Sequence, residues 1–283
     1  MAIILSSDST CDLGEELCAR YGVHTVPYHI ILGEGEFLDG VDMFPDHIYA
    51  IYKEKKILPK TAAINTEDYI AHFSPFVAQG HEVIHLTLGS GISTSYSNCL
   101  AAAAQLSGIH VVDSRSLSSG SGLLVIEAAE RIACGTLPAA QIAAEVQALT
   151  DNCHASFVIE TLEFLYKGGR CSALSMLGAN VLGLKPCIEV DSRDGRMGVG
   201  KKYRGALEKA LSQYVADKLQ GRGDLVTSRV FITHAGISEE RVELVRGLIA
   251  QYAQFDEVFV TRAGCTISSH CGPNTLGILF MTK

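Results

Sequence analysis

A run of hydroxyl side chains follows an apolar segment at residues 86–106. The sequence there, "LTLGSGISTSYSNCLAAAAQL", passes through two glycines and ends in an alanine-rich helical pattern. Five hydroxyl residues stand before the helix: Ser90, Ser93, Thr94, Ser95 and Ser97. Backbone N–H groups and the positive end of a helix dipole attract anions, and hydroxyls add further donors. We interpret the run as a binding site for a carboxylate or a phosphate.

Two alternatives remain open for the same run. Gly91-Ile92-Ser93 begins like the nucleophile elbow G-x-S-x-G, although Ser95 stands where the elbow needs its second glycine. A serine esterase or thioesterase using Ser93 would also need a histidine base, and the chain offers 10 histidines. The simplest alternative is an N-cap serine in a loop that hydroxyls hold in place.

The segment "HEVIH" at residues 81–85 matches the zinc-protease pattern H-E-x-x-H. That chemistry requires a helix, where residues four apart share one face. Here the segment lies between Gly80 and Gly89, which leaves room for a strand. Four residues of a strand span roughly 13 Å, too far for two imidazoles to share one zinc. We therefore predict a strand and no metal site.

Two other stretches place polar side chains beside glycines. Lys167 and Arg170 flank a diglycine, where they could recognise an anion or stabilise the end of a helix. His270 precedes a Gly-Pro turn, and we expect it in a loop, as a structural hydrogen-bonding group or as a functional one. The phosphate-binding patterns G-x-G-x-x-G and G-x-x-x-x-G-K-[ST] are both incomplete, so no nucleotide cofactor is predicted.

The composition is that of a globular protein of about two domains. The chain has 283 residues, of which 47% are hydrophobic, and a net charge of −8, which argues against nucleic acids and anionic membranes as partners. Nine cysteines without any C-x-x-C spacing suggest reduced thiols and a cytoplasmic location. The first residues lack a basic region and a long apolar run, so we expect no signal peptide and no membrane insertion.

Strands and helices alternate in the first half of the chain, which predicts βαβ units and a mostly parallel, layered sheet. The predicted strands cover 2–5, 24–32, 82–88 and 108–112, and the predicted helices cover 66–79, 93–106, 121–133 and 138–150. Thr66 is the expected N-cap of the first of these helices, and the segment 118–122 is expected to cap the helix at 121–133.

The pattern changes near residue 153, where we place the beginning of a second domain. A strand is followed there by two helices that Gly168-Gly169 separates, another strand, and a turn at 191–198. Helices are then predicted at 204–219 and 238–253, and strands at 229–235, 257–262 and 276–282. The predicted domains are residues 1–153 and 154–283.

Taken together, these stretches resemble the DegV family, a bacterial family. The resemblance extends along nearly the whole chain through seven ordered motifs. They are "SDSTCDL" at 7–13, "PKTAAINTEDY" at 59–69, "LGSGISTSYSN" at 88–98, "VVDSRSLSSGSGLLV" at 111–125, "TLEFLYKGGRCS" at 161–172, "GLKPCIEVDSRDGRM" at 183–197 and "HCGPNTLG" at 270–277.

The resemblance implies a fold and a function. The fold would be a two-domain α/β structure, with an N-terminal three-layer α/β/α domain, a C-terminal two-layer α/β domain with a mixed sheet, and the ligand between them. The function would be to bind a long-chain fatty acid in an apolar tunnel and to present its carboxylate to a separate ATP-dependent kinase subunit, which makes the acyl-phosphate. Such a protein is a lipid-binding carrier without catalytic chemistry or a cofactor of its own.

The resemblance also implies roles for four residues. Thr61 stands in the family's T-S-Q-P-type motif and Ser93 in its S-G-T motif, so both would donate to the carboxylate. His270 begins the H-x-G-P-G motif and would lie near the same oxygens. Arg170 ends the K-G-G-R motif and would belong to a head-group network or face the kinase. A desolvated carboxylate needs such convergent donors.

Three motifs depart from the family pattern. Ala62 replaces a serine, which removes one hydroxyl donor, and the following Gln-Pro-Ser becomes Ala63-Ile64-Asn65. Thr94 replaces the glycine of S-G-T. Asn274 replaces the last glycine of H-x-G-P-G, a mild change because asparagine tolerates a positive φ. Besides the carrier and the esterase, a subunit that acts mainly through protein contacts is a third hypothesis, and it requires an apolar interior that is closed and empty.

Overall fold

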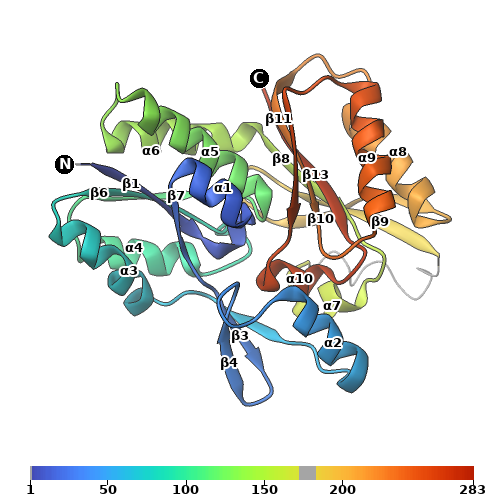
Figure 1. Cartoon of the computed structure of the whole chain (residues 1–283), viewed down its shortest axis with the longest axis horizontal. Coiled ribbons are helices and arrows are strands. Elements are labelled where there is room, and N and C mark those ends of the chain that lie inside the picture. The colour runs from blue at the N-terminus through green and yellow to red at the C-terminus, as the bar shows by residue number, and fades with distance from the viewer. Residues whose placement is uncertain (1, 172–182) are drawn as a thin grey trace.

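The first lobe of the protein is built on a four-stranded parallel sheet. A computed structural model describes residues 2–171 and 183–283. The sheet has the order β2-β1-β6-β7, which is Val23–Val26, Ile3–Asp8, Glu82–Thr87 and Ile109–Asp113 (Figure 1). Every neighbouring pair in it is parallel. The predicted parallel sheet is therefore confirmed, and H-E-x-x-H lies on β6 and the residue before it, as a strand.

Helices cover both faces of this sheet. Helices α3 (Thr66–Ala78) and α4 (Ser95–Ala103) pack together on one face. Helices α1 (Gly14–Tyr21), α5 (Ser119–Cys134) and α6 (Ala139–Ala148) lie on the other face, as Figure 1 shows. This arrangement confirms the three-layer α/β/α architecture.

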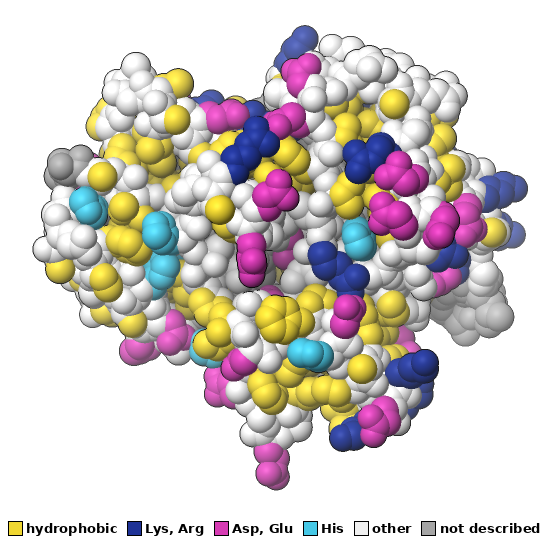
Figure 2. Space-filling model, in the orientation of Figure 1, with side chains coloured by type: hydrophobic (Ala, Val, Ile, Leu, Met, Phe, Trp, Pro, Cys, Tyr) yellow, Lys and Arg dark blue, Asp and Glu magenta, His cyan; other side chains and the backbone are white. Residues whose placement is uncertain are grey.

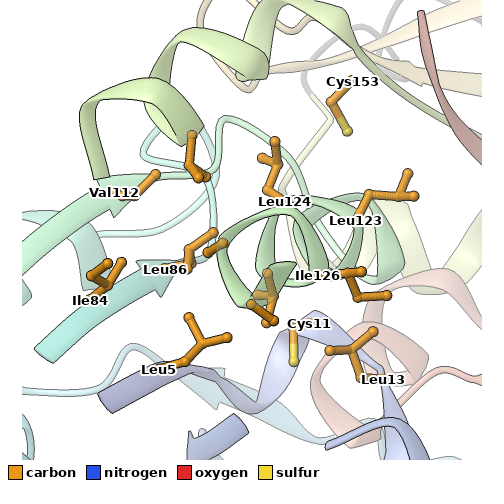
Figure 3. Close-up of a cluster of buried hydrophobic side chains, with 14 of the residues drawn as sticks. Leu5, Cys11, Leu13, Ile84, Leu86, Val112, Leu123, Leu124, Ile126 and Cys153 are labelled. Atoms are coloured by element: carbon orange, nitrogen blue, oxygen red, sulfur yellow. The ribbon is translucent and has the colours of Figure 1, made fainter. Parts of the chain in front are cut away.

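Helix α5 is buried because it packs between two sheets. Its side chains Leu123, Leu124 and Ile126 join Leu5 and Leu86 of the parallel sheet in one apolar cluster (Figure 3). The same cluster includes residues of the second lobe: Ala155, Phe231, Leu279 and Met281. Each apolar side chain of this size removed from water contributes about 1.5–3 kcal/mol, so the shared cluster stabilises the contact between the lobes.

The second lobe is built on a six-stranded mixed sheet with the order β10-β9-β8-β13-β11-β12. In that order the strands are Met197–Arg204, Leu184–Val190, Cys153–Val158, Leu276–Thr282, Leu225–His234 and Glu257–Arg262. Only β11 and β12 are parallel. Helices α8 (Leu207–Leu219) and α9 (Glu239–Tyr252) cover the face that α5 leaves open. The mixed sheet is thus confirmed. The chain enters it at residue 153, while the domain division at 153/154 stays a prediction.

A small third sheet was not predicted. Strands β4 (Gly35–Leu38), β3 (His29–Leu32) and β5 (Lys60–Ala62) form an antiparallel sheet that, with helix α2 (Pro45–Lys55), extends below the two lobes in Figure 1. The prediction of one strand at 24–32 is wrong. Pro27 has no N–H for a sheet ladder, and the chain there leaves β2 for β3, with Tyr28 at the transition.

The predicted helix caps differ from those in the structure. Asn65, not Thr66, caps α3, because its side-chain oxygen accepts a hydrogen bond from the Asp68 N–H at 2.8 Å. Ser118 precedes α5, but its hydroxyl makes no cap bond and donates to Asp12 instead, at 2.5 Å. Asn274 has a φ of 59°, which confirms that asparagine supplies the left-handed conformation there.

Two predictions concern the short helices of the second lobe. Helix α7 (Glu163–Gly168) is the first of the two helices expected around the diglycine, and the second falls largely outside the described residues. His270 was expected in a loop, and this is wrong: it lies near the end of helix α10 (Cys265–Cys271). The helix has only seven residues, four of them polar, which is too short a stretch to show the apolar periodicity that indicates a helix. Within the described residues, no helix is long and apolar enough to cross a membrane.

Two buried carboxylates of the N-terminal half hold the beginning of α10. Asp39 accepts hydrogen bonds from the backbone N–H groups of Cys265 at 2.6 Å and Thr266 at 2.9 Å. Asp12 accepts from the N–H of Gly264 at 2.9 Å. The first N–H groups of a helix have no partner within it, so these carboxylates satisfy them. Burial raises the pKa of Asp12 to about 8, and the nearby Asp39 adds to this shift.

Replacing Asp12 by asparagine tests this arrangement. The raised pKa means that the folded state holds a proton on Asp12 that the unfolded chain, with a pKa of about 3.9, releases. Wild-type stability contributed by this group is therefore lost as pH rises from about 4 towards 8. We expect the free energy of unfolding of D12N, measured relative to the wild type with urea, to rise over that range and to level off above it. A difference independent of pH would contradict the assignment.

Candidate functional site

A cavity of about 340 Å³ lies where the three sheets meet. It falls in the lower part of the range of roughly 300–1,000 Å³ that is typical of small-molecule sites. All four residues proposed from the sequence line it: Thr61, Ser93, Arg170 and His270. They come from β5, the loop before α4, the segment after α7, and α10. Residues more than two hundred positions apart in the chain therefore meet at one site.

Tyr28 organises the hydroxyls on one wall of the cavity. Its phenol oxygen lies 2.9 Å from the Ser93 hydroxyl and 2.6 Å from the Ser95 hydroxyl. Burial, followed by the Asp8 charge, raises the pKa of Tyr28 far above its ordinary value, so the phenol stays protonated. The Ser93 hydroxyl also accepts from the Ser95 N–H at 3.1 Å. This wall thus holds three hydroxyl groups in fixed mutual positions.

Thr61 and His270 form a second polar contact. The Thr61 hydroxyl lies 2.8 Å from Nε2 of His270. Burial and the nearby Arg170 charge lower the pKa of His270 to about 4, so the imidazole is neutral at physiological pH. Within the part of the chain that the structure describes, the buried Nδ1 of His270 has no hydrogen-bond partner. The neutral ring provides one donor and one acceptor at this end of the cavity.

Gly168 makes room for the His270 ring. A Cβ atom at this glycine would lie 2.2 Å from Nδ1 of His270. The first glycine of "KGGR" is therefore required by packing against the histidine, which the sequence analysis did not identify. The second glycine, Gly169, has a φ of 67° and ends α7 in the left-handed conformation that favours glycine.

Aliphatic side chains from both lobes line the rest of the cavity: Leu88, Ile92, Leu117, Leu165, Met197 and Ile267. They belong to, or pack against, a buried cluster that also includes Tyr28 and Phe157. The cavity therefore combines polar groups with aliphatic walls, as an amphiphilic ligand requires.

Gly91 allows the two lobes to approach at the rim. A Cβ atom there would lie 2.2 Å from the Asp194 carbonyl oxygen, in the turn between β9 and β10. The N–H groups of Ile92 and Ser93 both bond to the Gly89 carbonyl, at 3.0 and 3.2 Å. These two N–H groups are thus used within the loop.

Arg170 faces a second, outer cavity of about 370 Å³. This cavity shares Thr61, Arg170 and His270 with the main one and is also lined by Lys60 and Lys167. The Arg170 guanidinium is exposed and donates to the Gly168 carbonyl at 2.7 Å, while Lys167 pairs with Glu163 at 2.7 Å. The polar groups of the main cavity are therefore adjacent to a second cavity that is lined by cationic side chains.

Of the alternatives to anion binding, a serine in a loop that hydroxyls hold in place agrees with the contacts of Ser93, whereas the esterase and zinc-site patterns do not match this geometry. Among the described residues, the hydroxyl partners of Ser93 are Tyr28 and Ser95, so no histidine base is hydrogen-bonded to it. His85 of the H-E-x-x-H segment is buried and bonds to Ser6 and Asp8, at 2.9 and 3.1 Å. Residues 2–171 and 183–283 include no group of three or more His, Cys, Asp or Glu side chains placed to hold a metal ion.

The principal residue that the sequence did not reveal is Tyr28. It lies within the stretch 24–32 that resembles a single strand, and only the proline before it signals that the chain turns there. Thr266, on α10, is a second such residue: it lines the cavity, is buried, and its hydroxyl has no partner among the described residues. Thr94 lies on the exposed rim of the same cavity.

The fold and the cavity define a class: an α/β protein of two large sheets with a partly polar, partly apolar cavity at their junction. The family model of DegV proteins matches residues 2–283. The chain belongs to the DegV family.

Similar proteins cover the chain from end to end. A DegV domain-containing protein of Caldanaerobacter subterraneus is 28% identical, with 99% of each chain covered. A DegV family protein from Thermus thermophilus, solved as a fatty-acid-binding structure, is 26% identical with a TM-score of 0.88, and all of both chains is covered. A stearic-acid-binding protein from Eubacterium ventriosum is 25% identical with a TM-score of 0.85, over 100% of this chain and 99% of the other.

The packing of Gly168 against His270 can be tested with Gly168→Ala. The added methyl group overlaps the imidazole at Nδ1, so the ring must shift and its contact with Thr61 through Nε2 is disturbed. We expect the free energy of unfolding to fall by about 1–3 kcal/mol, as in other overpacked sites, and the His270 imidazole resonances to shift. Gly198→Ala is the control, since no atom lies within 4 Å of its new Cβ. Equal effects of the two substitutions would refute the contact.

Proposed function

We propose that the protein binds a long-chain fatty acid, with the carboxylate at the polar end of the cavity and the acyl chain along its apolar walls. The observation that supports this best is the convergence of Thr61, Ser93 and His270 on one cavity that is otherwise lined largely by aliphatic side chains. The fatty-acid-binding relatives from Thermus thermophilus and Eubacterium ventriosum support the same ligand class.

The polar end suits a carboxylate that has lost its water. The hydroxyls of Thr61 and Ser93 donate to its oxygens, and the positive charge of Arg170 lies near enough to affect both His270 and Tyr28. Hydrogen bonds to a charged group contribute about 1.5–3 kcal/mol each, so a few of them offset much of the desolvation cost. Ala62 contributes no hydroxyl, which leaves Thr61 as the donor from β5.

The apolar end supplies most of the affinity. Each methylene transferred from water to an apolar wall contributes about 0.8 kcal/mol, so binding strengthens with chain length as long as the cavity has room. A cavity with aliphatic walls favours this proposal over the third hypothesis, which requires a closed interior.

We further propose that the bound carboxylate is presented to a separate kinase subunit through the outer cavity. The cationic side chains Lys60, Lys167 and Arg170 surround the place where a phosphoryl group would meet the carboxylate. Positive charge stabilises a transferring phosphoryl group, whereas the chain itself has no P-loop. The protein would then be a carrier without catalytic activity alone. We expect it in the cytoplasm, where its cysteines stay thiols.

Identification of the bound lipid is the first test. The protein purified from a bacterial host is expected to retain a stoichiometric fatty acid in native mass spectrometry. Thr61→Val and Ser93→Ala should each weaken its retention by about 1–3 kcal/mol, or roughly five- to 150-fold. Ser97→Ala is the matched control, because that hydroxyl is exposed and bonds to the Thr94 carbonyl. Unchanged occupancy in the double variant would disprove the head-group assignment.

The presentation of the carboxylate can be tested separately with Arg170→Gln. A bacterial fatty-acid kinase subunit and ATP are added to the loaded protein, and hydroxylamine traps the acyl-phosphate as a hydroxamate. We expect hydroxamate formation to fall by tenfold or more while lipid retention changes less, because Arg170 faces the outer cavity. Lys209→Gln, an exposed charge on α8, should leave both unchanged. Equal losses of retention and turnover would assign Arg170 to binding alone.

A further inference from the structure

A small third cavity, of about 20 Å³, lies behind the apolar end of the main one. Three residues line both cavities: Leu117, Ile267 and Cys271. Because the two spaces share these side chains and differ in the rest of their lining, the three form the wall between them. We refer to Leu117, Ile267 and Cys271 as the partition.

The partition is made by both lobes. Ile267 and Cys271 are four residues apart on α10, so they lie on one face of that helix. Leu117 reaches them from the turn between β7 and α5. Leu117 and Cys271 are each 5% exposed. Burial raises the pKa of the Cys271 thiol to about 12, so this side chain stays neutral and serves as an apolar wall.

The turn that holds Leu117 is unusually constrained. Arg115 and Ser118, on either side of it, have φ values of 45° and 52°, which non-glycine residues rarely adopt. The serine hydroxyls hold this shape, since Ser121 donates to Ser114 at 2.9 Å and Ser118 donates to Asp12 at 2.5 Å. Backbone strain of this kind persists where the surroundings fix a position. The serine-rich motif at 113–121 therefore fixes Leu117.

The inner cavity is small and mostly apolar. Besides the partition, its lining includes Phe157, Leu279 and the small residues Ala235 and Ala263. The hydroxyl of Thr233, which also lines it, is already bonded to that of Thr261, at 2.9 Å. With a volume of only about 20 Å³, the inner cavity accepts little of an acyl chain as long as the partition is intact.

We propose that Leu117, Ile267 and Cys271 determine the maximum length of the acyl chain, which ends against them. This inference rests on the proposed function and deepens it, since it concerns the far end of the same site. Replacing a partition side chain by alanine joins the main cavity to the inner one and lets a longer acyl chain extend towards Ala263. The ligand class is then an unbranched fatty acid whose length the partition selects.

The test is a competition among fatty acids of different length. Wild-type protein, Leu117→Ala and Ile267→Ala are each loaded from an equimolar series of saturated straight-chain acids, and the retained species are identified by native mass spectrometry. We expect the preferred acid to lengthen by on the order of two to three methylenes in both variants. The affinity ratio of the longer to the shorter acid should rise roughly tenfold.

Two further variants isolate the partition. Leu88→Ala enlarges the main cavity without touching the inner one, so it should lower affinity without lengthening the preferred acid. Ala263→Val fills part of the inner cavity and, combined with Leu117→Ala, should restore the wild-type preference. If Leu88→Ala lengthened the preferred acid by the same amount, the inference would be overturned, because the loss of any wall side chain would then lengthen the preferred acid.

The outcomes separate the two proposals. If the wild type retains no fatty acid from the series, the proposed function fails. If the wild type retains acids and the preferred length is the same in Leu117→Ala and Ile267→Ala, the proposed function stands and the partition is not the limit. Two variants from different elements are used so that misfolding of one leaves the other as the test.

Discussion

The attachment of helix α10 to two buried aspartic acid side chains is the constraint on which the site depends. A helix of seven residues is not stable alone, because nucleation costs more than so few hydrogen bonds return. Asp12 and Asp39 satisfy its first N–H groups from the N-terminal half of the chain. Through this attachment, one short helix brings His270 to the polar end of the cavity and Ile267 and Cys271 to its apolar end.

The polar groups of the cavity are preorganised by hydrogen bonds within the chain, which a ligand can replace with bonds to itself. Tyr28 holds the Ser93 hydroxyl, and Thr61 holds His270. Hydroxyls that already have fixed positions would lose less conformational freedom in the proposed binding of a carboxylate. Two glycines permit this close assembly: Gly168 leaves space for the imidazole, and Gly91 lets the turn at Asp194 close on the serine loop.

Charge and polarity change in a regular spatial order along the site. The cationic outer cavity comes first, the hydroxyls and the imidazole follow, and the aliphatic walls and the partition lie beyond them. An amphiphile can enter this gradient in only one orientation without burying its charge in an apolar wall. On the face in Figure 2, acidic and basic side chains are interspersed, so this face has no extended basic surface of the kind that binds nucleic acids.

The sequence by itself determined the alternation of strands and helices, the parallel first sheet, the strand at the H-E-x-x-H segment and, through its motifs, the four residues that line the cavity. These features are local, because periodicity and short motifs act over a few neighbouring residues. Tertiary structure alone decided that Tyr28 leaves one sheet for another, that the short segment 265–271 forms α10, and that Gly168 packs against His270. Those outcomes depend on partners distant in the chain: Asp39 is more than two hundred residues from the helix that it caps, and no local pattern records that contact.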